Sequence, residues 1–491
     1  MTGGRLAPRL SVGVIPMSDR VVISLAVVAC VVLVAGAYLV VGRHLGALGS
    51  HLSLPIPGSA RHAFGGKAIP CGPKAFLATD LQAPYADFFR KWTVVAYREH
   101  GKHDPKWDAA AEKFLEAFAL RTAGTENAPD VKPMIVMADD LTARHCDDPL
   151  ILDRIGKLKL DLRQYADADR LVRAGIEGLK ARNFPPMCLA NAYQEMATLG
   201  GEVGADVKTT SFKWRPLAIN AFAEAGDKGN FGPYQQRIMW VVYLDLLNNW
   251  FPTAKDDFVK ALEDRPNTDT WLLNMARGKV HHDYAWSRRG TDWAYTVSEA
   301  DMRAFEEASD QERQCFEAAY KAHPEYPETC FGLLAVANCA RLDAGGSVRD
   351  WFDRGVAAQF DYLPIYQVMA TALLPRWGGS HEEMLAFGEE CLNTGRFDTD
   401  VPTMYGAMVQ MMANVDHDET IYRYPGVWPN LQRMFNGMLD YVVKNRPERE
   451  TDLRTRWAQI ATTAGHPQEA QRQWDLIRSS GGGAGKPATP R

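Results

Sequence analysis

Apolar side chains recur at helical spacing through most of the chain, and this pattern sets the fold class. One predicted helix face carries Ile365, Val368, Met369, Ala372 and Leu373. They follow the i, i+3, i+4, i+7, i+8 spacing of an amphipathic helix. Similar runs start at Trp107 and at Leu431, and no comparable run alternates with period two between hairpin turns. The sequence therefore predicts an all-α domain of short helices and short turns over residues 76–479.

A long apolar run near the amino end predicts a membrane-spanning helix. Residues 21–42 (VVISLAVVACVVLVAGAYLVVG) carry no charge over 22 residues. As a helix they would be about 33 Å long, enough to cross a bilayer core. A cleavable signal peptide has a shorter apolar core of roughly 7–15 residues. Residues 27–30 (VVAC) also look like a lipoprotein signal, but the apolar run continues for twelve residues past the cysteine. A retained transmembrane helix is the interpretation we favour.

The segments around that span have their own character. A short N-terminal segment, residues 1–20, precedes it, and residues 43–75 are rich in Gly, Pro and Ser, as expected of a linker. Residues 480–491 form a Gly-rich tail that we expect to be disordered. Three arginines precede the span and two follow it closely, a weak bias toward a cytoplasmic amino terminus. The predicted location is a single-pass membrane protein with its helical domain outside the cytoplasm.

Charge and cysteine usage exclude some functions. The 491-residue chain has a net charge of −5 and scattered Lys and Arg, so we expect no nucleic-acid partner. None of its eight cysteines forms a CxxC pair, which argues against a zinc or thioredoxin-like site. Most of them lie in apolar helical patterns and are interpreted as small buried side chains. The thirteen tryptophans are compatible with helix packing or with a groove for a sugar or peptide.

Two resemblances point to a helical-repeat protein. Residues 456–477 (RWAQIATTAGHPQEAQRQWDLI) place Ala458, Ala461, Gly465, Ala470 and Trp474 where a tetratricopeptide hairpin has its small residues, its turn and its large residue. The pair Gly156 and Ala168 repeats the spacing of Ala458 and Ala470. The chain thus resembles the tetratricopeptide-like superfamily, with degenerate repeats, and this resemblance implies an α-α superhelix (a solenoid) with an extended concave surface.

The second resemblance is to a bacterial family of helical-repeat proteins whose function is undefined. It rests on the segments LLPRWGG, which begins at Leu373, and AWSRRGTDWAYTV, which begins at Ala285. This resemblance implies no reaction and no cofactor.

Several candidate catalytic and metal motifs have structural explanations. Ser380 and His381 follow two glycines, but Ser380 stands three residues before Glu383, as in a helix capping box, and no G-x-S-x-G pattern surrounds it. His281 and His282 are adjacent and would point to different helix faces, without HExxH spacing. Residues 416–419 (DHDE) are typical of a solvated loop. The sequences FGGKA at residues 64–68 and GAGKP at residues 483–487 lack the leading glycine and the Ser/Thr of a phosphate-binding loop. We therefore expect no metal and no cofactor.

One aromatic and cationic segment is the candidate partner-binding site. The sequence predicts a turn at residues 286–295 (WSRRGTDWAY), which include Trp286, Arg288, Arg289, Trp293 and Tyr295; Arg376 and Trp377 offer the same chemistry elsewhere. Aromatic faces and guanidinium groups can hold a peptide carboxylate or a sugar face. Alternatively, the two tryptophans pack the core between repeats while the arginines pair with nearby acids.

The sequence thus predicts a membrane-anchored helical-repeat scaffold that binds a protein or peptide partner and catalyses no reaction. The alternative is a carbohydrate-active enzyme built as an α/α toroid, which needs two carboxylates facing each other across a cleft. An open superhelix would favour the scaffold, and a closed ring would favour the enzyme.

Overall fold

The computed structural model describes residues 68–72, 75–125, 128–202, 207–248, 254–290, 294–339 and 346–479. All regular elements in this part of the chain are helices, so the predicted all-α class is confirmed. The predicted segments 1–20, 21–42 and 480–491 lie outside the described residues, as does most of the predicted linker. Within the described residues, no helix is both long enough and apolar enough to span a membrane.

The first half of the domain starts with a 3₁₀ turn and continues through α-helices and one π-helical turn. Its elements are η1 (Ala78–Leu81), α2 (Gln82–Arg90), η2 (Lys91–Val95), α3 (Ala96–His100), α4 (Asp108–Thr122), α5 (Val131–Ala143), α6 (Pro149–Asp161), α7 (Tyr165–Ala181), α8 (Pro186–Glu202) and α9 (Val207–Lys228). The middle of the chain forms α10 (Gln235–Asn248), α11 (Ala254–Glu263), α12 (Thr270–Arg289), η3 (Ala294–Thr296), α13 (Glu299–Ala322) and α14 (Pro327–Cys339).

The second half alternates α-helices with short 3₁₀ turns. Its elements are α15 (Val348–Ala358), α16 (Leu363–Ala372), η4 (Pro375–Trp377), α17 (His381–Asn393), η5 (Val401–Thr403), α18 (Met404–Asp416), η6 (Glu419–Arg423), α19 (Val427–Asn445), η7 (Pro447–Arg449), α20 (Glu450–Thr463) and α21 (Pro467–Ser479).

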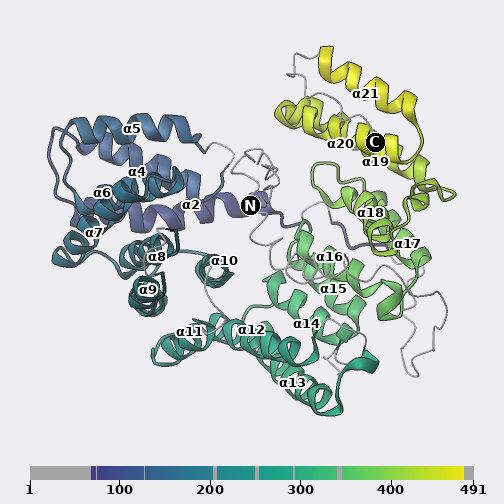
Figure 1. Ribbon diagram of the computed structural model, residues 1–491, viewed down its shortest axis with the longest axis horizontal. Helices are drawn as coiled ribbons and strands as arrows, with labels where there is room; N and C mark the ends of the chain where they lie inside the picture. Colours follow the sequence, from purple (N-terminus) through teal and green to yellow (C-terminus); the bar gives the residue numbers. More distant parts are fainter. Residues whose placement is uncertain are drawn as a thin grey trace, which may run out of the picture.

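Consecutive helices pack as hairpins, and the hairpins follow one another along an arc (Figure 1). The pairs α6–α7, α8–α9, α12–α13, α14–α15, α17–α18 and α20–α21 pack closely. Helices α2 to α9 form one arm of the arc, α11 to α13 its base, and α14 to α21 the other arm, with α5 and α21 at opposite ends. The arc is open. Helix α10 departs from simple stacking, because it packs against α2 as well as α12.

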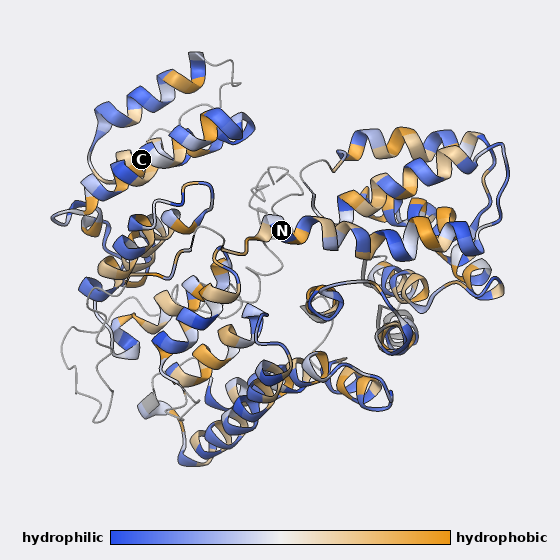
Figure 2. Ribbon diagram, turned by 180° about the vertical axis from the view of Figure 1, so that it is seen from behind, coloured by the Kyte–Doolittle hydropathy of each residue, from blue (hydrophilic) through white to orange (hydrophobic). Residues whose placement is uncertain are grey.

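Each helix carries hydrophobic and hydrophilic residues along its length (Figure 2), as expected where one face packs on a neighbour. Most of the predicted apolar residues are buried: Ile365, Met369, Ala372 and Leu373 in and after α16, and the run from Leu431 to Val442 in α19; Val368 is half-buried. The predicted repeat-like hairpin forms α20 and α21, with Ala458 and Ala461 fully buried and Gly465 at the turn with φ +81°. Its large residue, Trp474, is only half-buried.

Small residues allow the helices to approach closely. A Cβ atom added to Gly156 of α6 would lie 2.6 Å from Val172 of α7, so helices α6 and α7 pack closely at this glycine. A tighter case is the ring of Phe316 in α13, which lies between Gly278 of α12 and Gly332 of α14. A Cβ on either glycine would lie 2.5 Å from a ring carbon of Phe316, so the ring has no room on either side.

Replacing Gly332 with alanine is therefore expected to lower the free energy of unfolding by about 1–3 kcal/mol, the usual cost of overpacking a core. A glycine-to-alanine change inside a helix otherwise stabilises by about 1 kcal/mol. Gly226→Ala in α9 is the matched control, since its new Cβ would meet only the flexible end of Met239 at 3.1 Å. Urea unfolding followed by circular dichroism measures both. Equal effects of the two changes would contradict this description of the Phe316 site.

The segment that leads into α2 lies against the second half of the domain. Ile69 is buried, although it lies in the predicted linker. The amide of Phe360 donates to the carbonyl of Phe76 at 3.0 Å, and the amide of Ala78 donates to the carboxylate of Asp361 at 2.8 Å. These bonds join positions about 283 residues apart in the chain. Residues 75–78 therefore connect the two arms near the centre of the arc.

Candidate functional site

The structure brings together two of the predicted aromatic and cationic segments. The guanidinium carbon of Arg289, at the end of α12, lies 5.5 Å from the ring centre of Trp286 and 5.6 Å from that of Trp377 in η4. The two indole rings meet edge to face with their centres 6.4 Å apart. We call Trp286, Arg289 and Trp377 the Arg–Trp cluster. A cation between two indole faces is a favourable cation–π arrangement.

Two glycine turns place the members of the Arg–Trp cluster. Helix α12 ends at Gly290, whose φ of +65° and ψ of −169° are essentially restricted to glycine. After η4, Gly378 has φ +94°, and the Cβ of any residue replacing Gly379 would clash with the carbonyl oxygen of Leu373 at 2.1 Å. The glycines of the sequence RWGG thus let Trp377 turn back over the end of α16, beside α12.

The predicted turn at residues 286–295 is partly wrong. Trp286, Arg288 and Arg289 belong to the last turn of α12, because its apolar spacing continues up to Gly290. Arg288 forms an ion pair with Asp301 at the start of α13, 2.5 Å between nitrogen and oxygen. Trp293 lies outside the described residues.

The remaining candidates lie at the surface near the Arg–Trp cluster in sequence. Tyr295 in η3 is 84% exposed, and Tyr284 of α12, which the sequence analysis did not single out, is 53% exposed. The guanidinium of Arg376 lies 5.6 Å from the ring centre of Trp377. We call Tyr284, Arg288 and Tyr295 the flanking residues. They could contact a partner without any change in the packing of the cluster.

The Arg–Trp cluster also has a packing role. Trp286 contacts a small separate core of Ala285, Phe305, Ala308 and Val336, and its ring centre lies 5.7 Å from that of Phe305. Arg289 is only 9% exposed. Burial raises the pKa of the nearby Cys339 thiol to about 12, so this cysteine remains protonated and unreactive. The Arg–Trp cluster therefore packs within the fold, whereas the flanking tyrosines are exposed to solvent and accessible to a partner.

The Ser380–His381 pair has the structural role predicted from sequence. The hydroxyl of Ser380 accepts a hydrogen bond from the amide of Glu383 at 3.2 Å and caps α17. His381 is half-buried and lies 3.0 Å from a carboxylate oxygen of Asp416. Neither residue is arranged as a nucleophile with a base.

The histidine candidates are also accounted for by structural contacts. The Nδ1 atom of His282 lies 2.9 Å from a carboxylate oxygen of the buried Glu312, and burial lowers the pKa of His281. In the 416–419 loop, Asp418 accepts a hydrogen bond from the amide of Thr420 at 2.8 Å and caps η6. Among the described residues, no three His, Cys, Asp or Glu side chains are grouped to hold a metal ion.

Two arginines of the helix packing are each flanked by two carboxyl groups. Asp153 and Glu195 are both buried around Arg154: Asp153 forms an ion pair with it, and a carboxyl oxygen of Glu195 lies 3.7 Å from its guanidinium. Asp353 and Glu390 similarly bind Arg349, at 2.8 and 2.9 Å. Each arrangement neutralises a cation within the helix packing, which is a structural use of paired acids.

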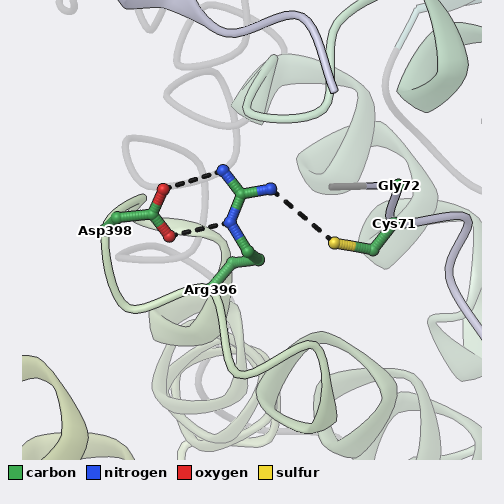
Figure 3. Close-up of a pocket in the computed structure, with 4 residues that line it drawn as sticks. All are labelled: Cys71, Gly72, Arg396 and Asp398. Carbon is green, nitrogen blue, oxygen red and sulfur yellow. Dashed lines mark hydrogen bonds and ion pairs between the residues drawn. The ribbon is translucent and has the colours of Figure 1, made fainter. Parts of the chain in front are cut away.

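Two hollows occur at the surface of the described structure. The first, about 530 Å³, lies where the N-terminal segment meets the loop after α17. Figure 3 shows Arg396 binding both carboxylate oxygens of Asp398 while its third nitrogen points toward Cys71, 3.8 Å from the sulfur atom. The second, about 520 Å³, lies between α18, η6 and α20. Each hollow has a single carboxylate residue in its lining.

No protein-family model matches the chain, and no curated protein is significantly similar to it.

Proposed function

We propose that the protein is a membrane-anchored helical-repeat scaffold that binds a protein partner and catalyses no reaction. Residues 21–42 would anchor it in a membrane as a single pass, and the helical domain would lie outside the cytoplasm. The open arc of helix hairpins supports this proposal, because such arcs expose an extended surface for binding (Figure 1). The alternative, a carbohydrate-active enzyme, would call for a closed helical ring, whereas the helices of the described residues follow an open arc.

The observation that carries the proposal is the Arg–Trp cluster with its flanking residues. Tyr, Trp and Arg are the residue types that contribute most to the binding energy at protein interfaces. Here Trp286, Arg289 and Trp377 form a rigid base, while Tyr284 and Tyr295 expose large apolar rings with hydroxyl groups that can form hydrogen bonds. Tyr295 is 84% exposed, and a tyrosine has only two side-chain torsions to fix, so it loses little side-chain entropy when it binds.

The test is affinity capture from native membranes with the double variant Tyr284→Ala/Tyr295→Ala. We expect partner recovery to fall at least tenfold, because hot-spot residues each contribute on the order of 2 kcal/mol or more. Variants of Trp286 and Arg289 are avoided, because both pack within the fold and their loss would unfold the site.

Val136→Ala on α5 is the matched control, since Val136 is 68% exposed at the far end of the arc. Its partner recovery should equal that of the wild type. Unchanged recovery with the double tyrosine variant, at unchanged circular dichroism, would contradict the proposed surface.

A further inference from the structure

The 520 Å³ hollow between α18, η6 and α20 has a polar lining that the packing of the helices does not use. Gln410 comes from α18 and Tyr422 from η6, while α20 supplies Asp452, Arg456 and Gln459. We call it the α18–α20 groove. Figure 1 shows these helices stacked in the second arm of the arc, away from α12.

Helix α20 presents two different faces. Trp457, Ala458 and Ala461 are buried, and the Trp457 ring stacks on Phe435 of α19 with 5.2 Å between centres. The groove side carries Asp452, Arg456 and Gln459, at spacings of four and three residues that place them along one stripe. The hydrophobic face therefore fixes the helix, and the polar stripe is left facing the groove.

The groove contains hydrogen-bonding groups that have no partner within the described structure. Arg456 makes no ion pair there, although Asp452 lies one helical turn before it. Its neighbours differ: Arg454 binds Glu450 at 2.7 Å, and Arg449 binds Asp400 at 3.1 Å.

The amides of the groove are similarly available. Gln410 and Gln459, which face the groove from α18 and α20, make no side-chain hydrogen bond among the described residues. By contrast, the Gln473 amide on the other side of α20 bonds both Arg454 and Glu469, at 2.8 and 2.6 Å. An arginine and two amides thus converge on one hollow with free donors and acceptors.

The position of Tyr422 limits what the ligand can be. Its side chain is 6% exposed, so it presents little ring surface to the groove. Burial raises the pKa of this phenol, the Arg456 guanidinium lowers it and the Glu419 carboxylate raises it, so both charges act on the hydroxyl. Sugar rings usually stack on an exposed aromatic face, and the groove has none among its lining residues.

We propose that the α18–α20 groove binds an extended peptide segment that carries an acidic side chain. A glutamine side chain has the same donor and acceptor pair as a backbone amide, so Gln410 and Gln459 can hold the peptide backbone from both walls. Arg456 binds the acidic side chain, because its guanidinium matches a carboxylate and makes no ion pair with Asp452, the one carboxylate in the groove lining. The groove thus selects for acidic sequence at a site separate from the Arg–Trp cluster. This inference rests on the proposed function in one respect only, that the partner is a protein or peptide.

The probe is a fluorescein-labelled peptide, Gly-Ser-Gly-Glu-Ala-Glu-Gly-Ser-Gly, titrated with the full chain in detergent and followed by fluorescence anisotropy. The matched peptide has Gln in place of each Glu. We expect the Glu peptide to bind at least tenfold more tightly than the Gln peptide, and added salt to weaken it. Arg456→Gln should weaken the Glu peptide at least tenfold and leave the Gln peptide unchanged.

Arg472→Gln on α21 is the control, because Arg472 pairs with Glu469 and does not line the groove. Its affinity for the Glu peptide should equal that of the wild type. The inference is overturned if the Glu peptide does not bind at millimolar protein, if both peptides bind equally, or if Arg456→Gln binds like the wild type. The Tyr284→Ala/Tyr295→Ala variant separates the two proposals: it should keep peptide binding, whether or not it loses the partner.

Discussion

Replacing Arg237 with methionine is expected to lower the free energy of unfolding by about 3–5 kcal/mol, the usual cost of leaving one charge of a buried pair uncompensated. Arg237 of α10 is buried, and its Nε donates to Glu328 of α14 at 2.7 Å. Its Nη2 donates to the side-chain oxygen of Gln359 at 2.5 Å. Without the arginine, the carboxylate of Glu328 stays buried without its cation.

The double variant Arg237→Met/Glu328→Leu is the control, because it removes both charges and should restore most of the lost stability. Replacement of a buried ion pair by apolar residues of similar volume is often neutral or stabilising. Urea unfolding of the full chain in detergent, followed by circular dichroism, gives the comparison. A double variant as unstable as the single one would show that side-chain packing, rather than charge pairing, stabilises the contact between α10 and α14.

The Arg237 network matters for the arc because it joins both arms. Gln359 also donates to Asp361 at 3.0 Å, and Asp361 in turn accepts the amide of Ala78 from the segment before α2. One continuous set of bonds therefore runs from α10 and α14 to the N-terminal segment. Its loss should weaken the contacts between the two arms, so that the region between α9 and α14 unfolds locally more often. Limited proteolysis of Arg237→Met should therefore cut between α9 and α14 first.

Replacing Glu195 with glutamine is expected to raise the stability of the protein at neutral pH by about 1 kcal/mol or more, since a buried carboxyl that must take up a proton on folding is exchanged for an amide that is neutral in both states. Glu195 of α8 is fully enclosed beside Asp153 and Arg154 of α6. Burial, and then the neighbouring Asp153 carboxylate, raise the pKa of Glu195 well above its ordinary value.

The pH dependence follows from the direction of that shift. The folded protein keeps the Glu195 proton at pH values where the unfolded chain has lost it, so it binds more protons and its stability falls as pH rises. The fall begins near the ordinary glutamate pKa, about 4.3, and continues up to the higher pKa of the folded state. Glu195→Gln removes this fall, so its advantage should grow as the pH rises above the ordinary glutamate pKa.

Asp153→Asn is the contrasting variant. Asp153 makes the closer contact with Arg154, whose guanidinium also lies over the rings of Trp92 and Phe118 at 5.1 and 5.2 Å. Loss of this carboxylate should therefore destabilise the protein at neutral pH, because the buried cation keeps only the more distant Glu195. If Glu195→Gln destabilises as much as Asp153→Asn, Glu195 is charged in the folded state and the account of this site is wrong.

Local spacing was enough to predict the helices and several of their contacts. The runs that end at Leu373 and Val442 are buried as predicted, and the Ser380 cap forms with the predicted bond to the amide of Glu383. These features depend on residues within one or two helical turns of each other, so their physics can be derived from sequence alone. The turn predicted at residues 286–295 was partly wrong, because the helix continues through Trp286 to Arg289 and ends only at Gly290.

Contacts between distant segments could not be predicted in this way. The local sequence does not indicate that Arg289 contacts Trp377, which is about 90 residues further along the chain. This contact depends on how several hairpins stack. The buried Arg237 network and the α18–α20 groove have the same origin. A polar stripe on α20, at Asp452, Arg456 and Gln459, was the one local signal of the groove, and it resembles any solvated helix face.

The most direct test of the proposed scaffold function is site-specific photocrosslinking in native membranes. A photoreactive amino acid is placed at position 295, in the flanking residues, or at position 136 on α5; both native side chains are strongly exposed, at 84% and 68%. The account predicts a discrete protein adduct from position 295 that is missing from position 136. The absence of any adduct from position 295, or the same adducts from both positions, would contradict it.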